Sequence, residues 1–201
     1  MKCRWIHLGW LVLALLVLGG CALPAPPAPH QSALRADGEA LVWQDEFRFV
    51  PPPAPWQLID LNEDDYSVAY MKLCRESSPC QSTLAYAEEP FGYSLDFVER
   101  QEEFFRRFLW ASRVVFAPAR LEKTEVLGGE GLIAITEGVE PVLGHKVHAK
   151  VVFARRGERV VGFYFTQWRS AEAAYDLRDE QDFLNFIESF RYLRPSFYEL
   201  L

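Results

Sequence analysis

Hydrophobic and polar residues alternate along many stretches of the chain. In residues 46–50, Phe47 and Phe49 fall on one side of an extended backbone, which is the period of a half-buried strand. Turn-forming residues such as Gly128–Gly131 and Arg156–Glu158 separate these stretches from one another. The pattern predicts neighbouring antiparallel strands over residues 46–50, 56–61, 66–73, 82–87, 114–116, 121–127, 131–137, 145–154 and 159–168.

Two segments have the spacing of amphipathic helices instead. Residues 97–109 follow a capping serine, Ser94, and place apolar side chains on one face and Glu and Arg side chains on the other. Residues 179–190 carry a second apolar stripe that includes three phenylalanines, and Asp179 is its predicted cap. The order of strands, long helix, strands and terminal helix predicts the α+β class. In this prediction a long central helix and a C-terminal helix pack on an antiparallel sheet.

Residues 1–20 have the character of an export signal. A basic head with Lys2 and Arg4 precedes an apolar run that is shorter than a membrane-spanning helix needs. The run ends in Leu18-Gly19-Gly20-Cys21, which resembles the lipobox of bacterial lipoproteins. The resemblance implies that Cys21 receives lipid, becomes the first residue after cleavage, carries acyl chains such as palmitate and contacts the lipid bilayer. An ordinary signal peptide cut nearby and an uncleaved anchor are the alternatives.

Domain organisation follows from the residues after the lipobox. Residues 21–40 are rich in proline and predict an extended tether, followed by a single folded domain over residues 41–195 and an apolar tail over residues 196–201. Ala22, rather than an aspartate, comes after the cysteine. In lipoproteins of Gram-negative bacteria this implies export to the outer membrane, with the domain facing the periplasm.

Cys74 and Cys80 are the cysteines of the predicted domain. In an exported chain such a pair predicts a disulfide, which would stabilise the fold by about 2 kcal/mol because it closes a short loop. Their spacing differs from the C-x-x-C pattern of redox and zinc sites, and no histidine lies near them in the sequence. The sequence therefore favours a structural role for the pair.

The order of the predicted elements, together with several aromatic and proline residues, resembles that of a known fold. Phe47-Arg48-Phe49 with Pro55-Trp56 after it, the helical segment 97–109, the three-stranded meander and the Phe-rich segment 183–190 resemble the PsbP-like fold over residues 42–194. That family includes an extrinsic subunit of the photosynthetic oxygen-evolving complex, Ran-binding nuclear import factors and bacterial lipoproteins. The resemblance implies an α/β/α sandwich with a binding or assembly role.

Charge and motif content narrow the range of functions. A formal net charge of −7 argues against a nucleic-acid binder, which needs a basic surface. His145 and His148 lie three positions apart, so on a strand they point to opposite faces and make a poor metal pair. Asp60, Asn62 and Asp64 lack the glycine and glutamate of a calcium loop and predict a solvated hairpin turn. No nucleophile–base motif is visible, so the sequence predicts no enzyme, metal site or cofactor.

The leading hypothesis is a lipid-anchored, non-enzymatic interaction or assembly module that binds another protein of the bacterial envelope. It predicts an exposed apolar and aromatic patch rimmed by charge, without an enclosed cavity. The alternative is a tethered carrier of a small ligand or lipid, which predicts a pocket of roughly 300–1,000 Å³. One face of the strand over residues 159–168 is a candidate aromatic surface, because Tyr164 and Trp168 alternate there with Phe163 and Phe165.

Overall fold

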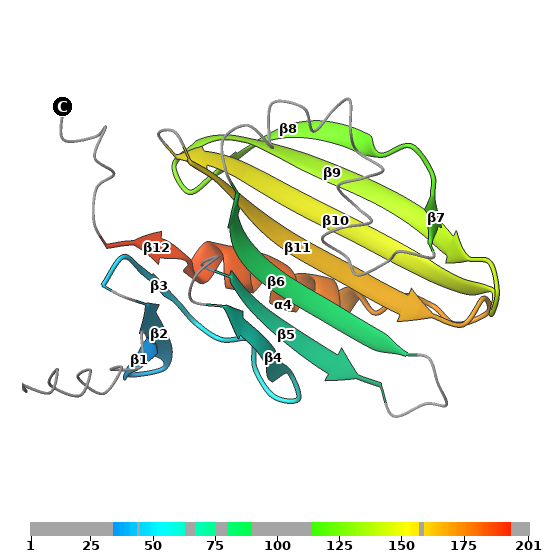
Figure 1. Ribbon diagram of the computed structural model, residues 1–201, viewed down its shortest axis with the longest axis horizontal. Helices are drawn as coiled ribbons and strands as arrows, with labels where there is room; N and C mark the ends of the chain where they lie inside the picture. Colours follow the sequence, from blue (N-terminus) through cyan, green and yellow to red (C-terminus); the bar gives the residue numbers. More distant parts are fainter. Residues whose placement is uncertain are drawn as a thin grey trace, which may run out of the picture. The chain divides into compact units, whose positions relative to one another are not determined.

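The computed structural model describes residues 34–43, 45–62, 67–74, 80–89, 114–156 and 159–193. Within these ranges the chain forms a 4-stranded and an 8-stranded antiparallel sheet (Figure 1). In spatial order the smaller sheet consists of β1 (Leu34–Asp37), β2 (Ala40–Trp43), β3 (Phe47–Phe49) and β12 (Arg191–Tyr192). The larger sheet consists of β4 (Gln57–Asn62), β5 (Ser67–Leu73), β6 (Gln81–Glu89), β11 (Arg159–Arg169), β10 (His145–Arg156), β9 (Gly129–Glu140) and β7 (Val115–Phe116), with β8 (Arg120–Val126) also paired to β9.

The centre of the larger sheet is buried on both faces. Strands β10 and β11 pair over their whole length, from Lys146 opposite Arg169 to Arg156 opposite Arg159. Successive side chains of β11 are therefore buried on alternate faces of the sheet. This explains why the sequence of the strand is almost continuously apolar.

One face of this sheet is covered by α4 (Leu177–Ser189). Its N-cap is Asp176, whose side chain accepts a hydrogen bond from the backbone N–H of Arg178. The helix expected at residues 179–190 is present, but Asp179 is not its cap. Asp179 instead lies in the first turn and is buried against the sheet.

Aromatic rings join α4 to both sheets. Phe190 lies 4.9 Å from Phe47 of the smaller sheet and 4.5 Å from Tyr86 of the larger one, between ring centroids. Nearer the start of the helix, Phe183 stacks on Phe165 at 5.2 Å. Such ring pairs stabilise a fold beyond the area that they bury. The short strands β3 and β12 are thus held by packing as well as by their hydrogen bonds.

The opposite face of the larger sheet carries a second buried cluster, formed by Val114, Ala134, Val147, Ala149, Val151, Phe153 and Tyr164. The ring of Tyr164 lies across Gly162 two positions earlier, where a side chain would collide with it. Tyr164 is 3% exposed, so the prediction of an exposed aromatic face on this strand is wrong. Both faces of β11 are used for core packing.

The predicted α+β class, and with it the PsbP-like α/β/α sandwich, is wrong. Antiparallel sheet dominates the described residues, and α4, with 13 residues, is the one helix among them. No helix in these ranges is long and apolar enough to cross a membrane. The predicted long central helix, the signal peptide and the lipobox lie outside the described residues.

Strands β1 and β12 account for part of the difference from the predicted fold. Each is too short to show a clear alternation, and each forms because a neighbouring strand offers an edge. Strand β1 begins at Leu34, inside the segment expected to be the tether. It turns at Gly38, whose φ of +64° suits glycine, into β2.

Candidate functional site

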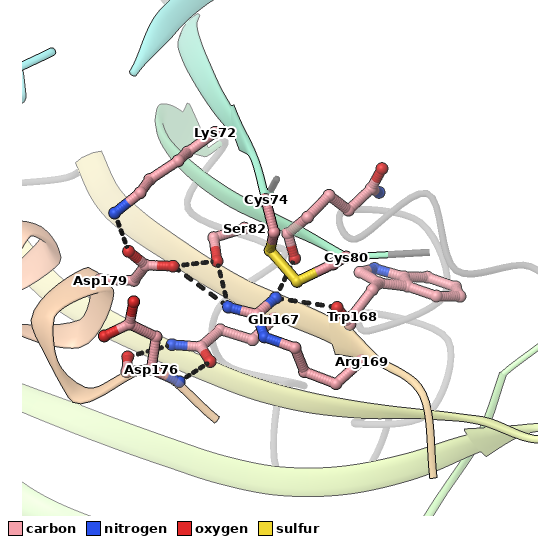
Figure 2. Close-up of a disulfide and its surroundings, with 10 residues drawn as sticks. Lys72, Cys74, Cys80, Ser82, Gln167, Trp168, Arg169, Asp176 and Asp179 are labelled. Atoms are coloured by element: carbon pink, nitrogen blue, oxygen red, sulfur yellow. Dashed lines mark hydrogen bonds and ion pairs between the residues drawn. A yellow bond between two sulfur atoms is a disulfide. The ribbon is translucent and has the colours of Figure 1, made fainter. Parts of the chain in front are cut away.

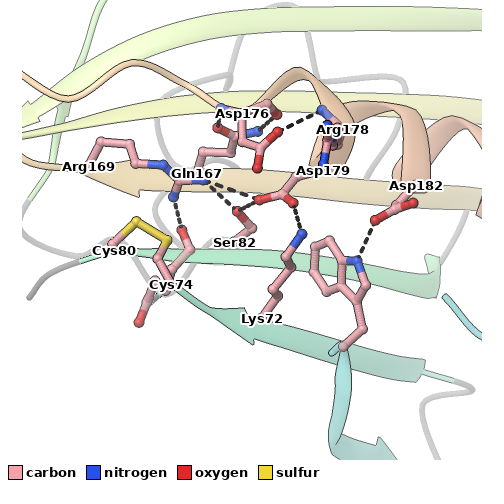
Figure 3. Close-up of polar contacts among 12 residues, drawn as sticks. Lys72, Cys74, Cys80, Ser82, Gln167, Arg169, Asp176, Arg178, Asp179 and Asp182 are labelled. Carbon is pink, nitrogen blue, oxygen red and sulfur yellow. Dashed lines mark hydrogen bonds and ion pairs between the residues drawn. A yellow bond between two sulfur atoms is a disulfide. The ribbon is translucent and has the colours of Figure 1, made fainter. Parts of the chain in front are cut away.

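A group of buried charges lies where α4 begins. Asp179 accepts hydrogen bonds from Lys72 of β5, Ser82 of β6 and Arg169 of β11, the last at 3.2 Å (Figure 3). Arg169 also donates to the hydroxyl of Ser82 at 3.0 Å. We call Lys72, Ser82, Arg169 and Asp179 the buried cluster.

Arg169 and Asp179 point into the buried cluster because each lies on the inward-facing side of its strand or helix. Arg169 continues the inward row of Phe163, Phe165 and Gln167 on β11. Asp179 lies on the α4 stripe of Phe183, Phe186 and Phe190. Because Ser82, Arg169 and Asp179 are all buried, no substrate can reach them. The arrangement ties the first turn of the helix to three strands, which is a structural role.

The disulfide between Cys74 and Cys80 borders this cluster (Figure 2). The two Cα atoms are 5.1 Å apart, and the backbone N–H of Cys74 donates to the carbonyl of Cys80 at 2.9 Å. Lys72 and Ser82 are register partners on the same hairpin. Arg169 donates to the carbonyl of Gln81, the residue directly after Cys80, at 2.8 Å. The disulfide therefore closes the hairpin that carries two members of the cluster.

Further polar contacts fix α4 on either side of the buried cluster. The amide of Gln167 makes two hydrogen bonds with the backbone of Asp176, at 2.7 and 2.8 Å (Figure 3). One turn further along, Asp182 accepts from the indole N–H of Trp56 at 2.8 Å. Lys150 of β10 pairs with Glu180. These contacts define both the position and the rotation of the helix on the sheet.

The histidines of β10 occupy different environments. His148 is largely buried, its ring lies 5.3 Å from that of Tyr175, and its Nδ1 has no hydrogen-bond partner within the described ranges. Burial lowers the pKa of His148, although Glu180 and Glu137 oppose the change. His145 is half-buried at the start of the strand. In the part of the chain that the structure describes, no group of three His, Cys, Asp or Glu residues is arranged to hold a metal ion.

A half-open groove of about 1030 Å³ lies at the other end of α4. We call it the α4 groove. Its walls are the second half of the helix with β12 on one side and the β8–β9 hairpin on the other, and β9 and β10 form its floor. The lining residues are Thr124, Glu125, Val126, Leu127, Gly128, Gly129, Ile133, Val152, Ala154, Leu184, Ile187, Glu188, Phe190, Arg191 and Tyr192.

The lining of the α4 groove is apolar inside and charged at the rim. Leu184 and Ile187 face it from a second stripe of α4, distinct from the stripe on the sheet, and Leu184 is 36% exposed. The exposed side chains of Glu125, Glu188 and Arg191 stand at its edge. Such a surface can bind a partner whose apolar side chains are flanked by polar ones.

The shape of the groove depends on how the β8–β9 hairpin curls. Its turn places Leu127 and Gly128 at positive φ, as the glycine-rich sequence predicts for a hairpin. A Cβ on Gly131 would lie 2.7 Å from the carbonyl oxygen of Phe153 and 2.6 Å from a methyl of Val126. Glycine at this position therefore allows β9 to lie close to β8 and to the backbone of Phe153 on β10.

The sequence predictions for the remaining candidate residues have mixed outcomes. Cys74 and Cys80 are bonded as expected. Asp60 and Asn62 lie on β4, where the side chain of Asp60 is exposed, and Asp64 of the predicted turn lies outside the described residues. Cys21 lies outside the described residues, and its lipidation stays a prediction. The sequence analysis did not predict the buried cluster. A signal was present, because Arg169 and Asp179 are charged residues that each lie in line with apolar side chains of the same element. The α4 groove was missed because no local pattern encodes the curl of a hairpin.

Comparison with known proteins gives distant structural similarity. No family model and no curated protein matches the chain. A Pseudomonas aeruginosa protein of unknown function, PA94, matches with a TM-score of 0.38 and 16% identity, over 67% of this chain and 81% of that one. LpqN of Mycobacterium tuberculosis, described as involved in cell envelope biogenesis, matches with a TM-score of 0.45 and 12% identity, over 73% and 82%. Similarity at this level does not establish a shared function, so the function of this chain has to be inferred from its own geometry.

Proposed function

We propose that the protein is a non-enzymatic interaction module of the bacterial cell envelope, and that the α4 groove receives apolar side chains of a second envelope protein. Acylated Cys21 and the proline-rich segment after it would hold the domain at the membrane, which is the outer membrane if the host is Gram-negative. The observation that carries the proposal is the α4 groove itself, which combines an apolar interior with a charged rim.

The form of the groove favours a polypeptide over a small molecule. A carrier shields its ligand from water, whereas this groove is only half enclosed by the residues that the structure describes. Leu184 projects into it while remaining 36% exposed, as expected for a side chain that gains contacts when a partner docks. Glu125, Glu188 and Arg191 at the rim supply charge of both signs, which would orient an amphipathic segment.

A tethered carrier of an apolar ligand is the second candidate, and the size of the groove supports it. About 1030 Å³ is the volume of a large ligand site. Extraction of the purified protein with organic solvent, followed by mass spectrometry, tests this candidate. A stoichiometric lipid or other apolar compound would favour it over the protein-binding proposal.

The test of the proposal is crosslinking in intact cells followed by purification of the wild-type chain and two matched variants. Leu184→Glu puts a charge into the groove, and Leu177→Glu puts the same charge on an exposed position at the other end of α4. We expect one envelope protein to be captured with the wild type and with Leu177→Glu, and to be lost with Leu184→Glu. Equal capture by all three would overturn the groove as the binding site. A parallel Cys21→Ser variant tests whether capture needs the lipid anchor.

A further inference from the structure

Far from the α4 groove, the turn between β9 and β10 exposes apolar side chains at its tip. Pro141–Gly144 form this turn, in which Val142 is 74% and Leu143 69% exposed. Turn tips are normally polar, because they project into water. Two neighbouring aliphatic residues at such a position therefore call for a physical explanation.

The turn is held by hydrogen bonds although it is exposed. The buried carboxylate of Glu140 accepts from the backbone N–H groups of Val142 and Leu143, at 3.1 and 2.7 Å. The N–H of Gly144 donates to the carbonyl of Glu140 at 2.9 Å, and the φ of +69° at Gly144 completes the reversal. The carboxylate of Glu140 is thus buried while the side chains of Val142 and Leu143 stay exposed. A turn whose exposed apolar side chains are already held in place is pre-organised, as expected of a contact surface.

The apolar surface continues from the turn onto the sheet. Val139 is exposed two residues before the turn and is the register partner of Val115 on β7, which is also exposed. We call Val115, Val139, Val142 and Leu143 the apolar tip.

Basic and aromatic residues lie at the same end of the sheet as the apolar tip. Lys146 is the register partner of Val139 on β10, and its Nζ lies 5.0 Å from the centre of the Tyr175 ring. Trp168, half-buried on β11, is the register partner of Val147 at the same end of the sheet. An exposed aliphatic turn with lysine, tyrosine and tryptophan near it has the kinds of side chain found at a membrane interface.

We infer that the apolar tip inserts into the surface of a phospholipid bilayer, so that the domain contacts the membrane directly. Insertion would place Val142 and Leu143 among the first acyl carbons and Lys146 and Tyr175 at the headgroups. The formal net charge of −7 makes attraction to anionic lipid unimportant, so contact depends on apolar burial. The inference rests on the proposed anchorage through Cys21, which supplies the local concentration of lipid that so small a surface needs.

A fluorescent probe on the tip tests the inference. Val142→Cys and, as a control, Leu193→Cys are labelled with an environment-sensitive fluorophore in the acylated chain, which is reconstituted into phosphatidylcholine vesicles. Leu193 is 46% exposed and follows β12 of the smaller sheet, away from the tip. We expect the probe at position 142 to shift to the blue and to be quenched by aqueous iodide about threefold less on vesicles than in solution, with no change at position 193. Equal accessibility of the two probes would overturn the inference.

Flotation of the same samples separates this inference from the proposed anchorage. If the chain does not float with the vesicles, lipidation of Cys21 is wrong. The tip is then tested on a Cys21→Ser chain held on nickel-chelating vesicles by a polyhistidine tag at residue 21. Shielding of position 142 there supports the inference, and an accessible probe on membrane-held protein refutes it. Replacing Val142 and Leu143 by serine should abolish shielding of a probe placed at Val139.

Discussion

The guanidinium group of Arg169 lies 3.2 Å from the carboxylate of Asp179, and the two side chains are 3% and 2% exposed. Lys72 and Ser82 share the same carboxylate. An ion pair so deeply buried is stabilising only while each charge keeps its partners, since neither can turn to water. The buried cations at the junction of α4 with the larger sheet therefore share a single carboxylate.

Asp179→Ala should lower the free energy of unfolding by about 3–5 kcal/mol, because it leaves Arg169 and Lys72 without their shared anion. Urea denaturation measures the change. Gln181→Ala, on the exposed side of the same helix, is the control and should stay within about 0.5 kcal/mol of the wild type. A loss at Asp179 as small as that of the control would show that the buried cluster is not an anchor.

Disulfide removal and loss of the Ser82 hydroxyl should not be additive. Cys74→Ser with Cys80→Ser should cost about 2 kcal/mol, and combining this change with Ser82→Ala should reveal a coupling of at least about 0.5 kcal/mol. The reason is that the disulfide closes the hairpin on which Lys72 and Ser82 face each other. Ser189→Ala removes a hydroxyl that accepts from the N–H of Val50 and should combine additively with disulfide loss. Additivity in both double variants would refute the coupling.

Acidification should destabilise the protein through His148. Burial lowers the pKa of His148 below the ordinary value of 6.5, so the unfolded chain takes up a proton before the folded chain does. The stabilising contribution of neutral His148 is therefore present above about pH 6.5 and is lost as the pH falls below it. Glu137 and Glu180 limit the size of the effect, and Lys150 adds to it.

The measurement is the urea midpoint as a function of pH, compared between the wild type and His148→Gln. The variant cannot take up the proton, so its midpoint should fall less on acidification. Parallel curves for the two proteins would show that His148 does not titrate in this way.

Gly131→Ala should destabilise the β8–β9 hairpin by about 1–3 kcal/mol and alter the α4 groove. The added methyl meets the backbone oxygen of Phe153, which cannot move without shifting β10. Hydrogen exchange should report faster opening of β8 and the start of β9, while the junction of α4 with β11 stays protected. Glu122→Ala, at an exposed position on β8, is the comparison and should leave exchange unchanged. An equal effect of both variants would rule out the role of Gly131 in shaping the groove.

The local elements of this fold were predictable because each depends on a short pattern. Alternation identified Phe47 and Phe49 as inward-facing on β3, the Phe183–Phe190 stripe identified α4, and Gly128 marked a hairpin turn. The fold class was not predictable in this way. The predicted class rested on two helices packed on a sheet, whereas sheet dominates the described residues and α4 is the one helix among them; β1 and β12, with 4 and 2 residues, carry too little pattern to be predicted as strands.

The candidate sites depend on relationships that a local pattern does not contain. Asp179 lies on an apolar stripe, but its place near the start of a helix predicts a cap, because an aspartate is ordinary there. Only the approach of Arg169, Ser82 and Lys72 from three strands gives it another role. The α4 groove likewise forms between two segments distant in the sequence. Leu184 and Ile187 of α4 line one side, and the β8–β9 hairpin, with its close contacts at Gly131, lines the other.

The most direct test of the proposed function is photo-crosslinking from within the α4 groove. A photo-reactive phenylalanine analogue replaces Leu184, inside the groove, or Leu177, outside it, and intact cells are irradiated. Binding of a partner in the groove predicts a crosslink to one envelope polypeptide from position 184 and none from position 177. A crosslink of equal yield from both positions, or none from position 184, would contradict the proposed function.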